Sequence, residues 1–208
     1  MRKIVRTSAP NFLTESLQKD WGKQYRKNRE DKGTSFEFKW PQLNNEKLNH
    51  KLLPYLNEIS QKHCFYCDAY PTKSYGERID HFKPKSNPLY YEDVCVWENL
   101  YLCCDHCNSY KKEQFDEKMI RPDDLGYKFD DYFEYNAKTG EIDIKLDISA
   151  EKQERAKITC KILGFNEGDK PEDRKRFFRL WHNDPDKYEF FDSYNFRFIF
   201  DNLMNIQP

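Results

Sequence analysis

Two closely spaced pairs of cysteines constrain this chain more than any other feature. Cys64 and Cys67 form one C-x2-C knuckle, and Cys104 and Cys107 form a second, with 36 residues between the two knuckles. The tight turn in such a knuckle points both sulfurs toward one tetrahedral ion at about 2.3 Å. The pair of knuckles therefore predicts a structural Zn2+ site with four cysteine ligands, which we favour over a redox pair and over unrelated buried thiols.

The remaining cysteines and the composition also argue against a disulfide framework. The 208-residue chain has seven cysteines, an odd number, and Met1 is followed by polar sequence instead of an apolar signal core. Cys95, Cys103 and Cys160 are expected to be packed thiols. No apolar run approaches the length of a membrane span. We therefore expect a soluble, cytoplasmic protein with no membrane partner, in which the ion supports a small core.

The charge is unevenly distributed, although the formal net charge is only -1. Residues 1–40 carry ten Lys and Arg against five Asp and Glu, residues 41–120 carry ten against twelve, and residues 121–208 carry fifteen against nineteen. The near-neutral total thus hides a basic N-terminal segment, so a nucleic-acid partner is not excluded. Because a nearly neutral protein binds bare nucleic acid weakly, we expect a further partner to help bring it to nucleic acid.

Hydrophobic periodicity predicts two helices before the first knuckle, over residues 11–30 and 45–62. Pro54 interrupts the second pattern and is expected to kink or split that helix. The apolar stripes consist of Leu13, Leu17, Trp21 and Tyr25 on the first helix, and Leu48, Leu52, Leu56 and Ile59 on the second. Residues 1–62 are thus predicted to form an N-terminal helical region, whose narrow stripe either docks a partner or packs as ordinary core.

The rest of the chain is predicted to form two further regions. Residues 63–120 carry the knuckles and are expected to form a loop, a short hairpin and a helix. Residues 121–208 are expected to form a hairpin and helices. Within them, Ser149 is placed as the N-cap of a helix that ends at Leu163, where Gly164 stops it. Two more helices are predicted at residues 174–181 and 188–204.

The segment between the knuckles contains the residue types that phosphodiester hydrolysis requires. This reaction needs a base that deprotonates water, a divalent cation and oxygen ligands that hold the cation. Asp80, His81 and Asn108 supply those types. Because neighbouring strand residues point to opposite faces, Asp80 and His81 share one site only if the strand end twists or bulges. Otherwise they are a strand-end pair, with Asn99 in a turn and Asn108 as a helix cap.

From Cys64 to Lys112, the order C-x2-C, Asp-His, Asn-Leu-x3-Cys-x2-Cys-Asn-x2-Lys resembles the HNH endonucleases. The resemblance implies an α+β fold with a zinc-stabilised ββα-metal, treble-clef-like core, flanked by N-terminal helices and by a C-terminal hairpin plus helices. It also implies an enzyme, a phosphodiester hydrolase.

The same resemblance implies a role for each matching residue. His81 would be the general base, and Asn99 would brace the hairpin and orient His81. Asp80 and Asn108 would hold a catalytic Mg2+ or Mn2+. The third motif position is Asn108 here instead of a histidine, and an amide oxygen suits Mg2+ better than an imidazole does.

Lysines flank the proposed site and are expected to contact the phosphates of the nucleic acid, with simple solvation as the alternative. They are Lys83, Lys85, Lys111 and Lys112.

Features outside the core resemble the PtuB-type HNH proteins of Septu and retron antiphage systems. They are the start Met-Arg-Lys-Ile, the run Gln-Lys-His-Cys-Phe-Tyr-Cys at residues 61–67, Gly-Glu-Ile at residues 140–142 and Ile-Leu-Gly-Phe-Asn at residues 162–166. The resemblance implies a nuclease effector whose expected substrate is DNA, with a PtuA-like ABC ATPase as partner and a retron RNA or msDNA as a further one.

Two alternatives remain open. One is an RNase or tRNA-cleaving toxin effector built on the same core, because a site that acts on the phosphodiester does not by itself distinguish DNA from RNA. The other is a zinc-knuckle module without catalysis that binds nucleic acid or protein.

Overall fold

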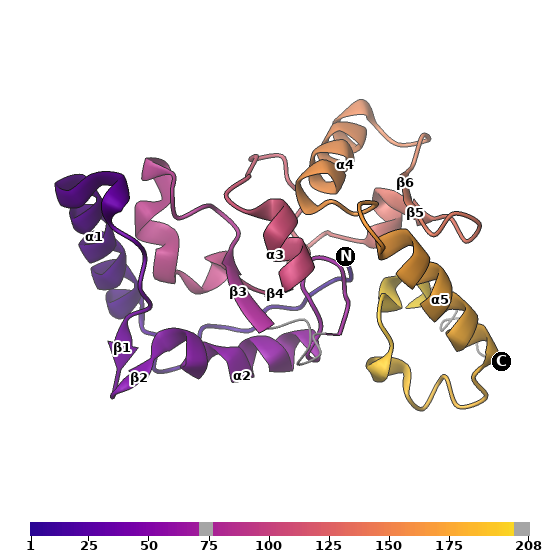
Figure 1. Cartoon of the computed structure of the whole chain (residues 1–208), viewed down its shortest axis with the longest axis horizontal. Coiled ribbons are helices and arrows are strands. Elements are labelled where there is room, and N and C mark those ends of the chain that lie inside the picture. Colours follow the sequence, from indigo (N-terminus) through magenta and orange to yellow (C-terminus); the bar gives the residue numbers. More distant parts are fainter. Residues whose placement is uncertain (71–76, 202–208) are drawn as a thin grey trace.

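The computed structural model describes residues 1–70 and 77–201 and shows helices combined with small antiparallel hairpins (Figure 1). The helices are α1 (Glu15–Lys32), α2 (Leu48–Ser60), α3 (Asp105–Lys111), α4 (Ala150–Leu163) and α5 (Lys170–Asn183). The paired strands are β1 (Gln42–Leu43) with β2 (Glu46–Lys47), β3 (Glu77–His81) with β4 (Leu100–Cys104), and β5 (Phe133–Tyr135) with β6 (Ile142–Ile144). The predicted mixture of helix and sheet is confirmed. In the described part of the chain, no helix is both long and apolar enough to cross a bilayer.

The N-terminal segment of the chain is built into the middle of the molecule. Figure 1 shows the N-terminus between α3 and α5, while α1 lies at the opposite end from the C-terminal region. Met1 is buried, and its carbonyl accepts a hydrogen bond of 2.7 Å from the hydroxyl of Tyr127. The amide of Ile4 donates to the carbonyl of Pro122 at 2.8 Å. Residues 1–13 therefore join the helical N-terminal region to the segment that follows α3.

Helix α1 begins after Thr14, whose hydroxyl accepts a hydrogen bond from the amide of Leu17. It packs against the 3-10 segment Pro88–Cys95, which lies between β3 and β4. Its buried residues are Gln18, Gly22 and Tyr25. The stripe predicted for this helix is therefore confirmed in part: Leu13 and Tyr25 are buried, whereas Leu17 and Trp21 are only partly buried. At 3.6 residues per turn, a face spaced four and then three residues apart stays over the partner better than a strict four-residue stripe.

Gly22 is where α1 approaches its neighbour most closely, and this contact can be tested. A Cβ at position 22 would lie 2.3 Å from the backbone oxygen of Glu92. We expect Gly22→Ala to destabilise the protein by about 1–3 kcal/mol, despite the higher helix propensity of alanine, because two backbones must separate. Gly126→Ala is the matched control, since nothing lies within 4 Å of its Cβ position. Urea unfolding of both variants would measure the difference, and equal stabilities would contradict the contact.

Helix α2 confirms its predicted stripe. Leu48, Leu52 and Leu56 are fully buried. Pro54 lies inside the helix, and the expected split does not occur. A proline removes one backbone donor, but it sits between two buried leucines, so the packing of the helix continues across it.

Strands β3 and β4 form the hairpin predicted between the knuckles. Asp80 pairs with Tyr101 and His81 pairs with Leu100. Every residue of β4 is buried, and α3 begins directly after it. The amide of Phe65 donates to the carbonyl of Leu102 at 2.9 Å, which attaches the first knuckle to the hairpin. The predicted order of loop, hairpin and helix is confirmed for the described residues of this segment, 63–70 and 77–112.

The predicted caps of α4 are also confirmed. The hydroxyl of Ser149 accepts a hydrogen bond from the amide of Lys152 at 3.3 Å. Gly164 ends the helix in the left-handed region, with φ 53°.

The helix predicted for residues 188–204 is wrong over its described part. From residue 188 to residue 200 the chain forms only turns and the short 3-10 segments Phe191–Ser193 and Arg197–Ile199. The buried guanidinium of Arg197 pairs with Asp68 in the first knuckle loop at 2.8 Å, and Phe196 adopts φ 59°. These tertiary contacts outweigh the helical pattern and join the C-terminal region to the knuckle.

Candidate functional site

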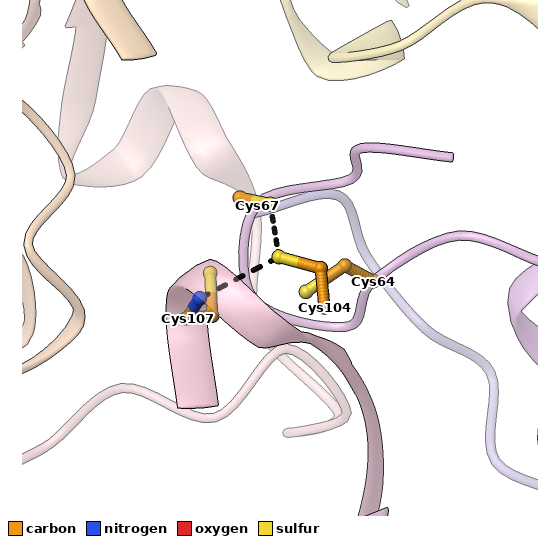
Figure 2. Close-up of side chains that lie close together, drawn as sticks. All are labelled: Cys64, Cys67, Cys104 and Cys107. Carbon is orange, nitrogen blue, oxygen red and sulfur yellow. Dashed lines mark hydrogen bonds between the residues drawn. The ribbon is translucent and has the colours of Figure 1, made fainter. Parts of the chain in front are cut away.

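Four buried cysteine side chains form a cluster that could hold a metal ion. Cys64, Cys67, Cys104 and Cys107 place their sulfurs within 4.8 Å of one another, gathered between the knuckle loop and the start of α3 (Figure 2). The sulfurs of Cys67 and Cys104 are 3.7 Å apart. A tetrahedron with zinc–sulfur bonds of about 2.3 Å has sulfur–sulfur edges of about 3.8 Å. The cluster therefore has the ligands and the spacing of a four-cysteine zinc site, as the knuckles predict.

Local backbone structure sets the spacing within each knuckle. In the first, the amide of Asp68 donates to the carbonyl of Cys64 at 2.8 Å, and Asp68 adopts φ 56°. In the second, Cys104 is the N-cap of α3, and its sulfur accepts a hydrogen bond from the amide of Cys107 at 3.5 Å. An amide pointing at a sulfur favours the thiolate form that a metal requires.

Lys170 contacts the cysteine cluster, and no pattern in the sequence predicted this contact. Its ammonium donates to the sulfur of Cys107 at 3.4 Å and to the carbonyl of Leu163 at 3.2 Å. Burial lowers the pKa of Lys170, but the cysteine thiolates raise it, and the net shift is upward. Four thiolates around Zn2+ leave two negative charges, so a buried ammonium stabilises the site. It lies 63 residues from Cys107, and no local pattern marks it.

The other thiols are packed, as expected. Cys95 and Cys103 are fully buried and Cys160 is half-buried, all outside the cluster.

His81 ends β3 with its imidazole held on several sides. Its Nε2 lies 3.0 Å from the carbonyl oxygen of Val94. Because a carbonyl only accepts, Nε2 carries the proton and Nδ1 keeps its lone pair. The ring of Trp40 stacks on the imidazole with 5.4 Å between ring centroids, and the ring of Phe38 contacts it edge-on with 5.2 Å between centroids. Burial, followed by the charge of Lys85, lowers the pKa of His81 to about 3. The imidazole is therefore neutral at physiological pH.

This protonation state is a testable property. A pKa of about 3 in the folded protein means that His81 stays neutral from pH 8 to about 5.5, because a histidine titrates near 6.5 only when unperturbed. Nitrogen-15 NMR should show one imidazole with a protonated Nε2 and no titration over this range. The signal would be assigned by its loss in His81→Asn. A midpoint near 6.5 for that signal would contradict the buried, Val94-bonded geometry.

Asn99 links the two segments that surround His81. Its side-chain oxygen accepts a hydrogen bond from the amide of Lys83 at 2.7 Å. Its side-chain nitrogen donates to the carbonyls of Lys83 at 3.2 Å and Asp93 at 3.0 Å. Lys83 lies two residues after His81, and Asp93 precedes Val94, the partner of the imidazole. Asn99 thus holds the end of β3 against the loop that orients His81.

Asp80 lies on the other face of β3. Its Oδ2 accepts a hydrogen bond of 2.6 Å from the hydroxyl of Tyr66 and pairs with the ammonium of Lys111 at 3.0 Å. Burial raises the pKa of Asp80, and the charge of Lys111 opposes that shift. Lys111 also donates to the carbonyl of His81 at 2.8 Å. The pairing with β4 is unbroken here, so the bulge that would bring the side chains of Asp80 and His81 to one face is not formed.

Asn108 is half-buried on α3, one turn before Lys111. This spacing puts it on the helix face that carries the partner of Asp80. In residues 1–70 and 77–201, no hydrogen bond joins its side chain to Asp80 or His81. The structure thus brings Asn99 to the surroundings of His81 and Lys111 to Asp80, whereas the side chain of Asn108 forms no hydrogen bond to either site residue within the described chain.

The four lysines expected at phosphates differ in exposure. Lys111 is fully buried in its ion pair with Asp80, so the expectation that it contacts phosphate does not fit this arrangement. A buried ammonium is stabilised by the opposite charge that it pairs with, here the carboxylate of Asp80. The other three are nearer the surface: Lys83 pairs with Asp93 at 3.3 Å, Lys85 pairs with Glu113 at 2.9 Å, and Lys112 is exposed.

The comparisons with known protein families and with curated proteins found no relative of this chain. No model of a known protein family matches the chain, and no curated protein matches it significantly. The chemistry of the site is therefore argued from its own residues.

Proposed function

We propose that this protein is a metal-dependent endonuclease of the HNH type, which hydrolyses the phosphodiester bonds of nucleic acid, with DNA as its substrate. One observation carries the proposal. A neutral histidine at the end of β3 is oriented by the carbonyl of Val94, and Asn99 ties both flanking segments together. Structural histidines do not need a free ring nitrogen, whereas a general base does.

In the proposed reaction, Nδ1 of His81 takes a proton from a water molecule, and the resulting hydroxide attacks phosphorus in line with the leaving 3'-oxygen. The products are a 5'-phosphate and a 3'-hydroxyl. The hydrogen bond from Nε2 to Val94 keeps the ring in the required tautomer and stabilises the imidazolium that forms. The aromatic neighbours of His81 limit the access of other water.

A divalent cation, Mg2+ or Mn2+, would be held by Asp80 and Asn108, whose oxygens are the ligands such ions prefer. Only Oδ2 of Asp80 is engaged by Tyr66 and Lys111, and in the described chain its Oδ1 accepts no hydrogen bond. That free oxygen and the half-buried amide of Asn108 fit a cation. Because Asp80 and His81 lie on opposite faces of the unbroken strand, the cation would reach the phosphate at His81 only if the end of β3 twists when substrate binds. When bound there, the cation would neutralise the charge that develops on the phosphate.

The zinc would be structural, because four thiolates leave no open position for a substrate or a water molecule. We further propose that the nuclease acts as the effector of a bacterial antiphage system with an ABC-type ATPase. The support for this role is the resemblance of the outer motifs and the near-zero net charge, which calls for a partner that delivers the substrate.

A zinc-knuckle binding module without catalysis is the second candidate. The ion pair between Lys111 and Asp80 favours it, because the protein's own cation already neutralises the carboxylate that a metal would use.

Incubation of the purified protein with plasmid DNA and with RNA separates the two candidates. The proposal expects cleavage that requires Mg2+ or Mn2+ and stops when a chelator is added, with products that carry 5'-phosphates. Binding that is independent of cation, with no cleavage of either substrate, would contradict the nuclease and support the module. Cleavage of RNA alone would support the RNase alternative.

A further inference from the structure

A cavity of about 220 Å³ lies between α1 and the segment that leads from α1 to β1. Figure 1 shows this segment leaving the end of α1 and running to β1 at one end of the molecule. Phe36 and Phe38 line the cavity from the segment, and Trp21 and Tyr25 line it from the helix. The cavity is therefore lined mainly by the basic segment 1–40 and has aromatic walls on both sides.

One of the aromatic rings that line the cavity has no stacking partner in the described part of the chain. Tyr25 contacts Phe38 at 5.4 Å and Phe36 at 6.0 Å. Trp21 is half-buried, yet within residues 1–70 and 77–201 no other ring and no cation packs on its indole. An indole that lines a cavity without a stacking partner offers its face to a planar ligand.

The same cavity contains carboxamides that can read the edge of such a ligand. Gln24 and Asn28 line it from α1, one turn apart. The amide nitrogen of Asn28 donates to the backbone carbonyl of Gln24 at 2.9 Å, so its oxygen remains free to accept. The side chain of Gln24 is exposed and makes no hydrogen bond within the described chain. Carboxamides pair with the donor and acceptor edges of nucleobases. Lys39, at the same cavity, supplies a charge for a phosphate.

The cavity adjoins the proposed catalytic histidine. Phe38 is one of its walls, and the ring of Phe38 lies 5.2 Å from that of His81. Cys95, another wall, directly follows Val94, whose carbonyl orients the imidazole. A group bound in the cavity would therefore be one aromatic ring away from His81, the residue that would activate water. In a nucleotide, one sugar likewise separates the nucleobase from its phosphate.

We infer that this cavity binds one unstacked nucleobase of the substrate while the adjoining phosphate lies at His81. The inference rests on the proposed function and specifies its substrate: nucleic acid that is single-stranded at the cleavage point or has a base turned out of the duplex. A base inside a duplex is stacked on both faces and cannot enter. Trp21 provides the stacking face, and Gln24 and Asn28 read the base.

The test measures binding of short fluorescein-labelled single-stranded DNA and RNA by anisotropy, without added divalent cation so that no cleavage occurs. Trp21→Ala is expected to weaken binding about tenfold, as loss of one base–aromatic stack does. One abasic position in the oligonucleotide should weaken binding to the natural protein by a similar factor. The same abasic position should cause little further loss in Trp21→Ala, because both changes remove the same contact. The tighter of the DNA and RNA complexes identifies the preferred source of the base.

Two further variants keep the result interpretable. Gln24→Ala changes an exposed side chain and should alter the preference among bases at the sensitive position without affecting folding. Tyr55→Ala removes an exposed aromatic ring from α2 and should leave binding unchanged. Failure of both oligonucleotides to bind, or equal abasic losses in the natural protein and in Trp21→Ala, would overturn the inference. Coupled losses without cleavage under any cation would instead support the base site and contradict the proposed hydrolysis.

Discussion

Replacing Cys64 or Cys107 by serine is expected to unfold the region around the hairpin. Each substitution removes one of four sulfurs that converge on a single ion. Structural zinc contributes about 10–16 kcal/mol to the folding of small zinc-binding units, whereas a whole domain is stable by only about 5–15 kcal/mol. Zinc content by elemental analysis and thermal unfolding by circular dichroism should therefore fall together.

Cys160→Ser is the control for these variants, because Cys160 is half-buried and outside the cluster. It should retain its zinc and unfold near the temperature of the unchanged protein. A variant of Cys64 or Cys107 that binds no zinc but unfolds at the unchanged temperature would refute the structural role of the metal.

Replacing His81 by alanine is expected to reduce cleavage by a factor on the order of 10² to 10⁴, the usual contribution of a general base. The zinc should stay bound, because the imidazole contacts Val94, Phe38 and Trp40 and no cysteine of the cluster. The measurement is the cleavage rate of the preferred nucleic acid with saturating Mg2+ or Mn2+, together with the zinc content of the same preparation.

The exposed His50 on α2 provides the matched control, since His50→Ala should leave cleavage unchanged. Partial recovery of His81→Ala by added imidazole would identify the lost group as a base. An unchanged cleavage rate in His81→Ala with zinc still bound would eliminate the proposed mechanism.

Features that depend on near neighbours in the chain were predictable from the sequence. The knuckles form at their C-x2-C spacings, because two residues between cysteines suffice for one tight turn. Ser149 and Gly164 limit α4 as expected, because a hydroxyl at the N-cap and a glycine in the left-handed region act within one turn of their own positions. The β3–β4 hairpin lies where it was predicted from the sequence, between the two knuckles.

Features that depend on distant partners were not predictable in this way. The buried face of α1 is chosen by the segment Pro88–Cys95, which crosses it at Gly22. Residues 191–199 form short turns instead of a helix because Arg197 reaches Asp68, 129 residues earlier. Lys111 looks like a surface lysine in the sequence, yet it is buried against Asp80. In each case one long-range ion pair or close backbone contact outweighs the weak local preference.

Local turns and strand pairing control where the four sulfurs meet and which polar residues lie between them, so both could be predicted from the order of the residues. How those residues are used depends on packing between distant parts of the chain. This packing placed Lys170 on the sulfur of Cys107, turned Asp80 and His81 to opposite faces, and set the aromatic segment 36–40 against the imidazole. A buried charge or ring is stabilised by the groups that pack against it. Packing brings together residues that are far apart in the sequence, so no local spacing predicts these contacts.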